Sequence, residues 1–151
     1  NPFRLTWPEA ERAIRKSITY AMTEEYGDED LSLWVDEICD FPKVNRKRFN
    51  EWKDQMDREI RLYRGRASHN IIDQLYPTDY AVFFEYFWGK YLSAIYKPHT
   101  LAYWTENLKF IADRVRNPEM HSRKNLLLPE SQQRATLICQ EIIECVRAAK
   151  I

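Results

Sequence analysis

The sequence predicts an all-α protein, folded as a compact helical bundle. Apolar residues recur every three or four positions along most of the chain, no segment shows the alternation of a β-strand, and the chain has only three glycines. With 44% hydrophobic residues in 151, the chain can bury a core of its own as one domain. This composition and a formal net charge of zero exclude a disordered chain. The longest apolar runs are far shorter than the roughly 20 residues that span a membrane.

The first helix is expected from about Thr6 to Tyr26. Thr6 is positioned to cap it, Glu9 to complete a capping box, and Pro8 to occupy the first turn, where a missing N–H costs nothing. Gly27 is expected to end it, because glycine readily adopts the left-handed conformation of a helix stop. A short helix is expected next, between residues 30 and 42.

A third helix is expected from Asn45, with Gly65 as its stop. Basic residues occupy one face, and the other face carries apolar residues at helical spacing: Phe49, Trp52, Met56, Ile60 and Tyr63. Residues 43–66 hold nine bases and four acids, whereas residues 1–42 hold ten acids and four bases. The basic segment is suited to a polyanion, although a solvated helix face explains such a pattern as well.

Residues 68–76 are expected to form a short helix or a connector, which ends at Pro77. Thr78 or Asp79 then opens a helix with aromatic side chains nearly all round, and eleven of the 21 aromatic residues fall between Tyr76 and Trp104. Such a helix is expected either at the centre of a bundle or with one face against another subunit. Exposed rings at these positions would instead be suited to stacking on unpaired bases.

Two further helices complete the bundle. Lys97-Pro98 is expected to break the chain before a helix from Thr100 to about Val115, whose buried stripe is Leu101, Trp104, Leu108, Ile111 and Val115. A final helix after Pro129 presents Leu137, Ile138, Ile142 and Val146. We expect one domain, in which residues 1–75 form an N-terminal helical part packed on a core of residues 76–151.

The histidines and cysteines do not predict a metal or cofactor site. Cys39, Cys139 and Cys145 form no CxxC pair, and the three histidines have no metal-ligand spacing. No phosphate-binding glycine loop or dinucleotide fingerprint is present. Because three cysteines do not make a disulfide framework, a reducing cytoplasm is the expected location.

The residues most suggestive of chemistry precede the final helix. Asn117 is expected to be an N-cap, followed by Pro118 and Glu119 in a first helical turn, and His121 then shares a face with Asn117. Arg116 lies immediately outside this turn. A helix N-terminus with an arginine favours phosphate binding, and histidine transfers protons near neutral pH. These residue types together are suited to phosphodiester cleavage.

The segment Arg116-Asn117-Pro118-Glu119-Met120-His121 resembles the R-x4-6-H motif of HEPN domains. The resemblance extends over about residues 76–150 and implies an α-helical domain that acts as a homodimer, with Arg and His of both subunits facing a shared cleft. Many members of that family are metal-independent RNases. They use the RNA 2′-hydroxyl as nucleophile and leave 2′,3′-cyclic phosphate and 5′-hydroxyl ends.

By this resemblance His121 is the general acid and base, and Arg116 holds the scissile phosphate. Asn117 orients the phosphate or caps the helix that presents His121. The bases around the motif, Arg114, Arg123 and Lys124, are expected to contact the RNA backbone. A second R-x4-H match, from Arg64 to His69, is discounted because it straddles a predicted helix end and has glycine where the family has a polar residue.

The same resemblance implies a biological setting. HEPN domains often serve in bacterial defence, including antiviral and toxin systems, or in RNA processing, and the chain begins at Asn1 as though cut from a longer protein. Two alternatives remain open. One is a non-catalytic helical module for dimerisation or protein interaction, and the other is a nucleotide-binding regulator that uses the same arginine.

Overall fold

The computed structural model describes residues 2–27, 46–117 and 123–151. Within these residues all regular elements are helical and no β-strand is present, which confirms the all-α class. The short helix expected between residues 30 and 42 lies outside them. In the described part of the chain, no helix is both long and apolar enough to cross a membrane.

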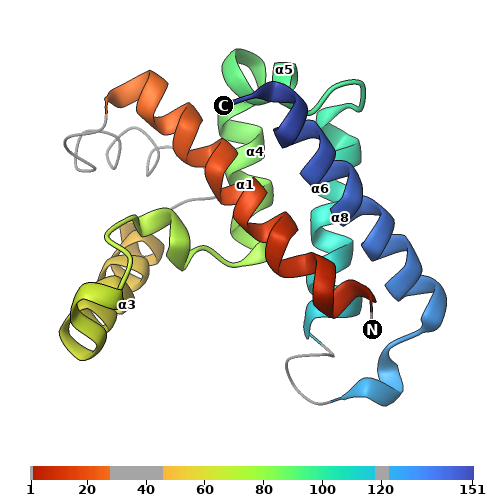
Figure 1. Cartoon of the computed structure of the whole chain (residues 1–151), viewed down its shortest axis with the longest axis horizontal. Coiled ribbons are helices and arrows are strands. Elements are labelled where there is room, and N and C mark those ends of the chain that lie inside the picture. Colours follow the sequence, from red (N-terminus) through yellow and green to blue (C-terminus); the bar gives the residue numbers. More distant parts are fainter. Residues whose placement is uncertain (1, 28–45, 118–122) are drawn as a thin grey trace.

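Helices α1 (Pro2–Tyr26) and α8 (Pro129–Ala149) lie side by side and form the most extensive helix pairing in the described structure (Figure 1). The start of α8 at Pro129 confirms the sequence prediction. Ile138, Ile142 and Val146 of α8 are buried, but Leu137 is 56% exposed. Neighbouring helical residues lie about 100° apart around the axis, so burial of Ile138 turns Leu137 toward solvent.

The start of α1 differs from the prediction. The helix begins at Pro2 rather than near Thr6, and the Thr6 hydroxyl donates a hydrogen bond to the Pro2 carbonyl at 2.6 Å instead of capping. Pro8 therefore lies inside the helix. Phe3 and Trp7 are both buried and their rings stack 5.7 Å apart, so the first turn is stabilised by core packing despite the N–H that Pro8 lacks.

Two long helices cross the middle of the bundle in opposite directions (Figure 1). The first, α4 (Pro77–Phe87), continues into the π-helical segment η3 (Trp88–Leu92) and the short α5 (Ser93–Ile95). The second, α6 (Leu101–Phe110), continues into the π-helical η4 (Ile111–Arg116). The sequence predicts this helix from Thr100, and Thr100 is its N-cap, with the hydroxyl accepting the Tyr103 N–H at 3.2 Å. Because α4 and α6 pack against each other antiparallel, the start of α4 lies near the end of η4.

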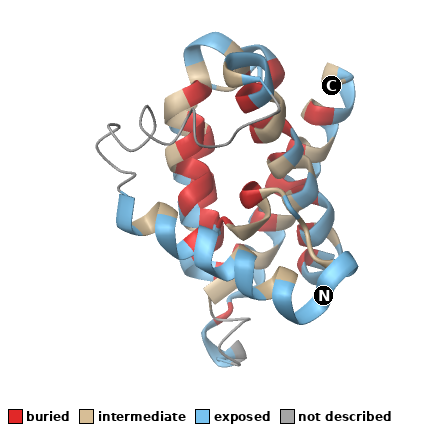
Figure 2. Ribbon diagram, turned by 90° about the vertical axis from the view of Figure 1, so that its left-hand side faces the viewer, coloured by how far each residue is buried: buried red, intermediate tan, exposed pale blue. Residues whose placement is uncertain are grey.

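The aromatic helix is the central one. Tyr80, Phe83, Phe84 and Phe87 are at most 3% exposed, and Figure 2 shows the buried residues concentrated where the helices face one another. These four rings are therefore unavailable for stacking on bases or for contacting another subunit. The helix begins at Pro77, one or two residues before the predicted start, because proline is well suited to a first helical position.

Helix α3 (Arg46–Tyr63) lies to one side of the bundle (Figure 1) and is attached mainly through Trp52, its buried residue. Two short 3-10 segments, η1 (Arg64–Arg66) and η2 (Ile71–Gln74), lead from it to α4. The left-handed residue after α3 is Arg64, with φ of 51°, so the glycine stop predicted at Gly65 is wrong. After α1 the predicted stop is confirmed, since Gly27 has φ of 82°.

Candidate functional site

Arg116 is the last residue of η4 and is half-buried, as is Asn117. Asn117 keeps helical angles, φ −66° and ψ −48°, and its N–H donates to the Ala112 carbonyl. The N-cap conformation predicted there is therefore wrong. Ile111 and Val115 are buried against α4 and α8, and this packing stabilises the helix as far as Asn117. Arg116 therefore lies within a continuous helix.

The guanidinium of Arg116 lies against the ring of Tyr76, with its Cζ atom 5.5 Å from the ring centroid. Tyr76 immediately precedes α4 and is 51% exposed. A second guanidinium, that of Arg48 in α3, lies 5.2 Å from the same centroid. Two arginines far apart in the sequence therefore meet at one exposed ring.

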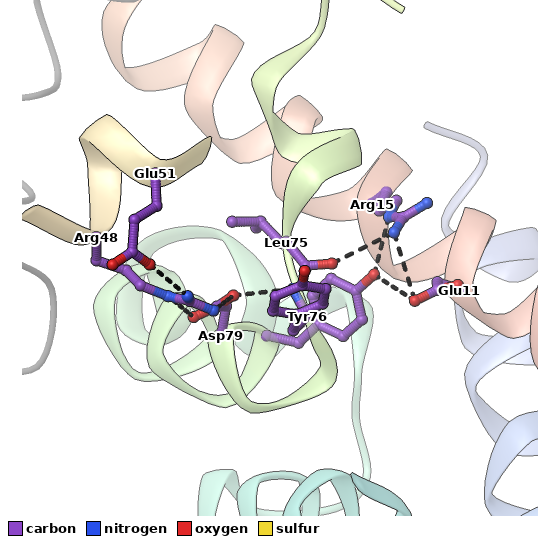
Figure 3. Close-up of polar contacts among 8 residues, drawn as sticks. Glu11, Arg15, Arg48, Glu51, Leu75, Tyr76 and Asp79 are labelled. Carbon is purple, nitrogen blue, oxygen red and sulfur yellow. Dashed lines mark hydrogen bonds and ion pairs between the residues drawn. The ribbon is translucent and has the colours of Figure 1, made fainter. Parts of the chain in front are cut away.

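Arg48 is held by two carboxylates. Its Nε and Nη2 atoms donate to both oxygens of Asp79 at 3.1 and 2.7 Å, and Nη1 donates to Glu51 at 2.9 Å (Figure 3). The hydrogen bonds that Arg48 donates to Asp79 raise the pKa of Arg48 above its usual value. Asp79 also accepts the Tyr76 backbone N–H at 2.8 Å. Arg48 and Asp79 thus attach α3 to the start of α4 and fix the backbone of Tyr76.

Arg116, in contrast, has no carboxylate within ion-pair distance among the described residues. Contact with an aromatic face contributes about 0.5–2 kcal/mol and leaves the guanidinium N–H groups free to donate. A planar guanidinium in this state is suited to an oxyanion such as phosphate. The structure therefore places one of the predicted site residues in a setting that favours anion binding.

The other predicted residues are described only in part. Arg114 and Arg123 are exposed, and the described structure shows no ion pair for either. Lys124 begins the 3-10 segment η5 (Lys124–Leu126), but its side chain is outside the description. His121 lies outside the described residues, together with Pro118, Glu119 and Met120, so its distance to Arg116 is not defined.

A second polar network joins α1 to the start of α4. The buried hydroxyl of Tyr80 donates to Glu11 and accepts from Nε of Arg15, both at 2.8 Å (Figure 3). Arg15 also donates to the Leu75 carbonyl at 3.3 Å. Burial raises the pKa of Tyr80 far above its usual value, so the hydroxyl remains protonated and its role is structural.

The described residues hold no cluster of three or more potential metal ligands from histidine, cysteine, aspartate and glutamate. Burial raises the pKa of the Cys139 thiol to about 12, and the pKa of Cys145 is also raised, chiefly by burial. Neither thiol is an activated nucleophile at neutral pH. Arg64 and His69, from the discounted second motif, are both exposed.

Three residues at this site have no local sequence signal for a function. Tyr76 and Asp79 resemble an ordinary helix start, and Arg48 is one of nine bases in its segment. Only the antiparallel pairing of α4 and α6 brings Tyr76 to Arg116. Comparisons with models of protein families, with curated proteins and with solved structures gave no match for the chain.

Proposed function

We propose that this protein is a metal-independent endoribonuclease of the HEPN type, acting as a homodimer through Arg116 and His121. The observation that supports this most is the state of Arg116. Its guanidinium rests on the Tyr76 ring and has no carboxylate partner in the described structure. The motif from Arg116 to His121 supplies the chemical rationale. We place the activity in the cytoplasm, in defence or toxin systems or in RNA processing.

In the proposed reaction the RNA 2′-hydroxyl attacks the adjacent phosphorus. A histidine accepts the 2′-hydroxyl proton as the new P–O bond forms, and the bond to the 5′-oxygen breaks as that oxygen gains a proton. Arg116 stabilises the negative charge that develops on the non-bridging oxygens. The products are a 2′,3′-cyclic phosphate and a 5′-hydroxyl, with His121 of the two subunits providing base and acid.

The remaining motif residues are assigned to substrate binding. Asn117 follows Arg116 on the same helix and is half-buried, so its amide is proposed to orient the phosphate that Arg116 holds. Arg114, Arg123 and Lys124 are proposed to contact neighbouring phosphates. Such contacts depend strongly on ionic strength, because neutralising a phosphate releases its counterions.

The test is cleavage of a mixed-sequence RNA in EDTA by the wild type and by the Arg116→Ala and His121→Ala variants. His69→Ala is the matched control, because His69 belongs to the second R-x4-H match. We expect the wild type and His69→Ala to cleave, with cyclic phosphate ends, and both motif variants to lose activity while remaining folded. RNA with 2′-deoxy nucleotides at the cleavage sites should resist.

Different outcomes point to different errors. Cleavage that requires added metal would reject the metal-independent mechanism, and loss of activity in His69→Ala but not His121→Ala would reassign the motif. Sedimentation of the same samples tests the dimer. A folded wild type that leaves every RNA intact would reject the nuclease.

A non-catalytic docking module is the second candidate. Leu126 and Leu128 are 48% and 49% exposed and directly precede α8, and exposed large apolar residues often mark protein contacts. This candidate predicts no RNA cleavage. It also predicts that Leu126→Ser with Leu128→Ser abolishes association with a partner or second copy, whereas Arg116→Ala does not.

A further inference from the structure

A pocket of about 330 Å³ lies between α1 and η2, away from the residues of the proposed nuclease site. We call it the α1–η2 pocket, and its lining residues are Arg12, Arg15, Lys16, Thr19, Asn70 and Asp73. The first four follow the spacing i, i+3, i+4 and i+7, so they share one face of α1. Three cations and one carboxylate therefore surround a single cavity.

Arg15 is held in place. Its Nε atom donates a hydrogen bond to the Tyr80 hydroxyl. Its Nη2 atom donates to the Leu75 carbonyl and forms an ion pair with Glu11 at 3.4 Å. Its Nη1 atom has no partner in the described structure. The guanidinium is therefore anchored on one side and retains donors, which lowers the entropic cost of binding a ligand.

Arg12 and Lys16 are exposed, and neither has an ion-pair partner among the described residues. The only carboxylate that lines the pocket, Asp73, accepts a hydrogen bond from the Ser68 hydroxyl. The three cations outnumber the two carboxylates beside them, Asp73 and the Glu11 that pairs with Arg15, so the local charge remains positive. Arginine and lysine together are the side chains that most often bind phosphate in proteins.

The opposite wall is polar and ordered by hydrogen bonds. Asn70 donates from Nδ2 to the Thr19 hydroxyl at 2.9 Å and accepts the Ile72 N–H at 3.1 Å. Thr19 keeps its own proton to donate, and the Asp73 carboxylate keeps lone pairs to accept. Such groups recognise hydroxyl groups rather than a second phosphate.

We propose that the α1–η2 pocket binds a small phosphate ester of a sugar. The phosphate lies against Arg12, Arg15 and Lys16, and the sugar hydroxyls are bound by Asp73 and Thr19. The cavity volume is at the lower end of the range for ligand pockets, which is appropriate for a sugar phosphate. This site is independent of the proposed nuclease activity, since it shares no residue with it.

The test is a titration of the intact protein with inorganic phosphate, ribose 5-phosphate and ribose at constant ionic strength, followed by calorimetry and amide shifts. Arg12→Gln and Lys16→Gln each remove one unanchored cation, and Asp73→Asn removes the carboxylate. Lys109→Gln is the matched control, because Lys109 is an exposed lysine of α6 whose loss changes the net charge equally. Arg15 is left intact because it anchors Tyr80.

We expect ribose 5-phosphate to bind, with shifts at Arg12, Lys16 and Asn70, and ribose not to bind measurably. Arg12→Gln and Lys16→Gln should each weaken ribose 5-phosphate and phosphate by about tenfold. Asp73→Asn should weaken ribose 5-phosphate by about fivefold without weakening phosphate. Lys109→Gln should remain within about twofold of the wild type.

Three results would overturn the proposal. One is the absence of shifts at the pocket with ribose 5-phosphate. The second is equal weakening by Lys109→Gln, which would indicate general charge attraction. The third is displacement of ribose 5-phosphate by oligodeoxyuridylate, which lacks the 2′-hydroxyl needed for cleavage, with affinity rising with length, because the pocket would then belong to a nucleic-acid-binding surface. None of these results depends on whether the protein cleaves RNA.

Discussion

Two arginines contact the ring of Tyr76, and they differ in how their charge is balanced. Arg48 gives two hydrogen bonds to Asp79 and one to Glu51, whereas Arg116 meets no carboxylate in the described structure. Both guanidinium carbons lie within 5.5 Å of the same ring centroid. The comparison shows that two guanidinium groups in contact with one aromatic ring can differ in charge balance, because different side chains surround them.

The difference follows from the elements that carry the arginines. Asp79 lies in the first turn of α4, where a carboxylate is favoured by the helix dipole, and it serves both Arg48 and the Tyr76 N–H. Arg48 is thereby used to join α3 to the bundle. Arg116 approaches the same ring from the end of η4 and has no carboxylate partner among the described residues.

The largest expected effect is on activity. Arg116→Ala should lower RNA cleavage by about 10²–10³-fold, because a group that stabilises transition-state charge is removed. Its unfolding free energy should fall by no more than about 1 kcal/mol, since only a cation–π contact with an exposed ring is lost. Single-turnover cleavage and urea unfolding measure the two quantities. Unchanged cleavage would remove the distinction between the two arginines.

The next effect is on stability. Asp79→Asn should lower the unfolding free energy by about 2–3 kcal/mol, because the half-buried Arg48 would keep only the more exposed Glu51 as a carboxylate partner. Urea unfolding measures it. Asp54→Asn, at an exposed position of α3, is the matched control and should change stability by less than about 0.5 kcal/mol. Equal losses in the two variants would show that Arg48 is not a structural clamp.

Tyr76 contacts both arginines, and substitutions of its ring test whether the contribution of Arg116 to cleavage depends on that contact. Tyr76→Leu should slow cleavage by about 5–20-fold through loss of the cation–π contact, while Tyr76→Phe retains most activity. In an Arg116→Ala background the Leu substitution should have no further effect. Tyr63→Leu, at another exposed tyrosine, is the control. An additive effect would indicate that Tyr76 acts independently of Arg116.

The smallest effect concerns the second partner of Arg48. Glu51→Gln removes an exposed i,i+3 ion pair with side chains 30% and 49% accessible. We expect a loss of about 0.2–0.5 kcal/mol, since surface pairs contribute little and are screened by salt. Urea unfolding of the wild type and Glu51→Gln at low and high ionic strength measures this loss of unfolding free energy. A loss comparable to that of Asp79→Asn would mean that both carboxylates hold Arg48 equally.

Local signals predicted helix ends well where one residue decides the conformation. Gly27 stops α1 and Pro129 opens α8, each as expected. The expected cap at Thr6 is wrong because burial of Phe3 and Trp7 extends the helix backward. At such positions tertiary packing contributes more than a capping hydrogen bond.

The candidate site also combines features that local sequence signals predicted with features that tertiary packing decided. The motif pattern singled out Arg116, but it also predicted a helix break at Asn117 that burial of Val115 and Ile111 removes. It offered no reason to connect Tyr76 or Arg48 with Arg116. Tyr76 lies 28 positions from Arg48 and 40 positions from Arg116, beyond the reach of any local pattern.

By itself the sequence determined the all-α class, limited the aromatic helix to a bundle centre or a subunit contact, and singled out the arginine of the motif. These properties follow from apolar periodicity and from residue chemistry, which act locally. The tertiary structure alone decided that Arg48 is neutralised by Asp79 while Arg116 has no carboxylate partner among the described residues. Charge balance depends on which side chains meet in space, and here the attachment of α3 to the start of α4 and the antiparallel packing of α4 and α6 determine that.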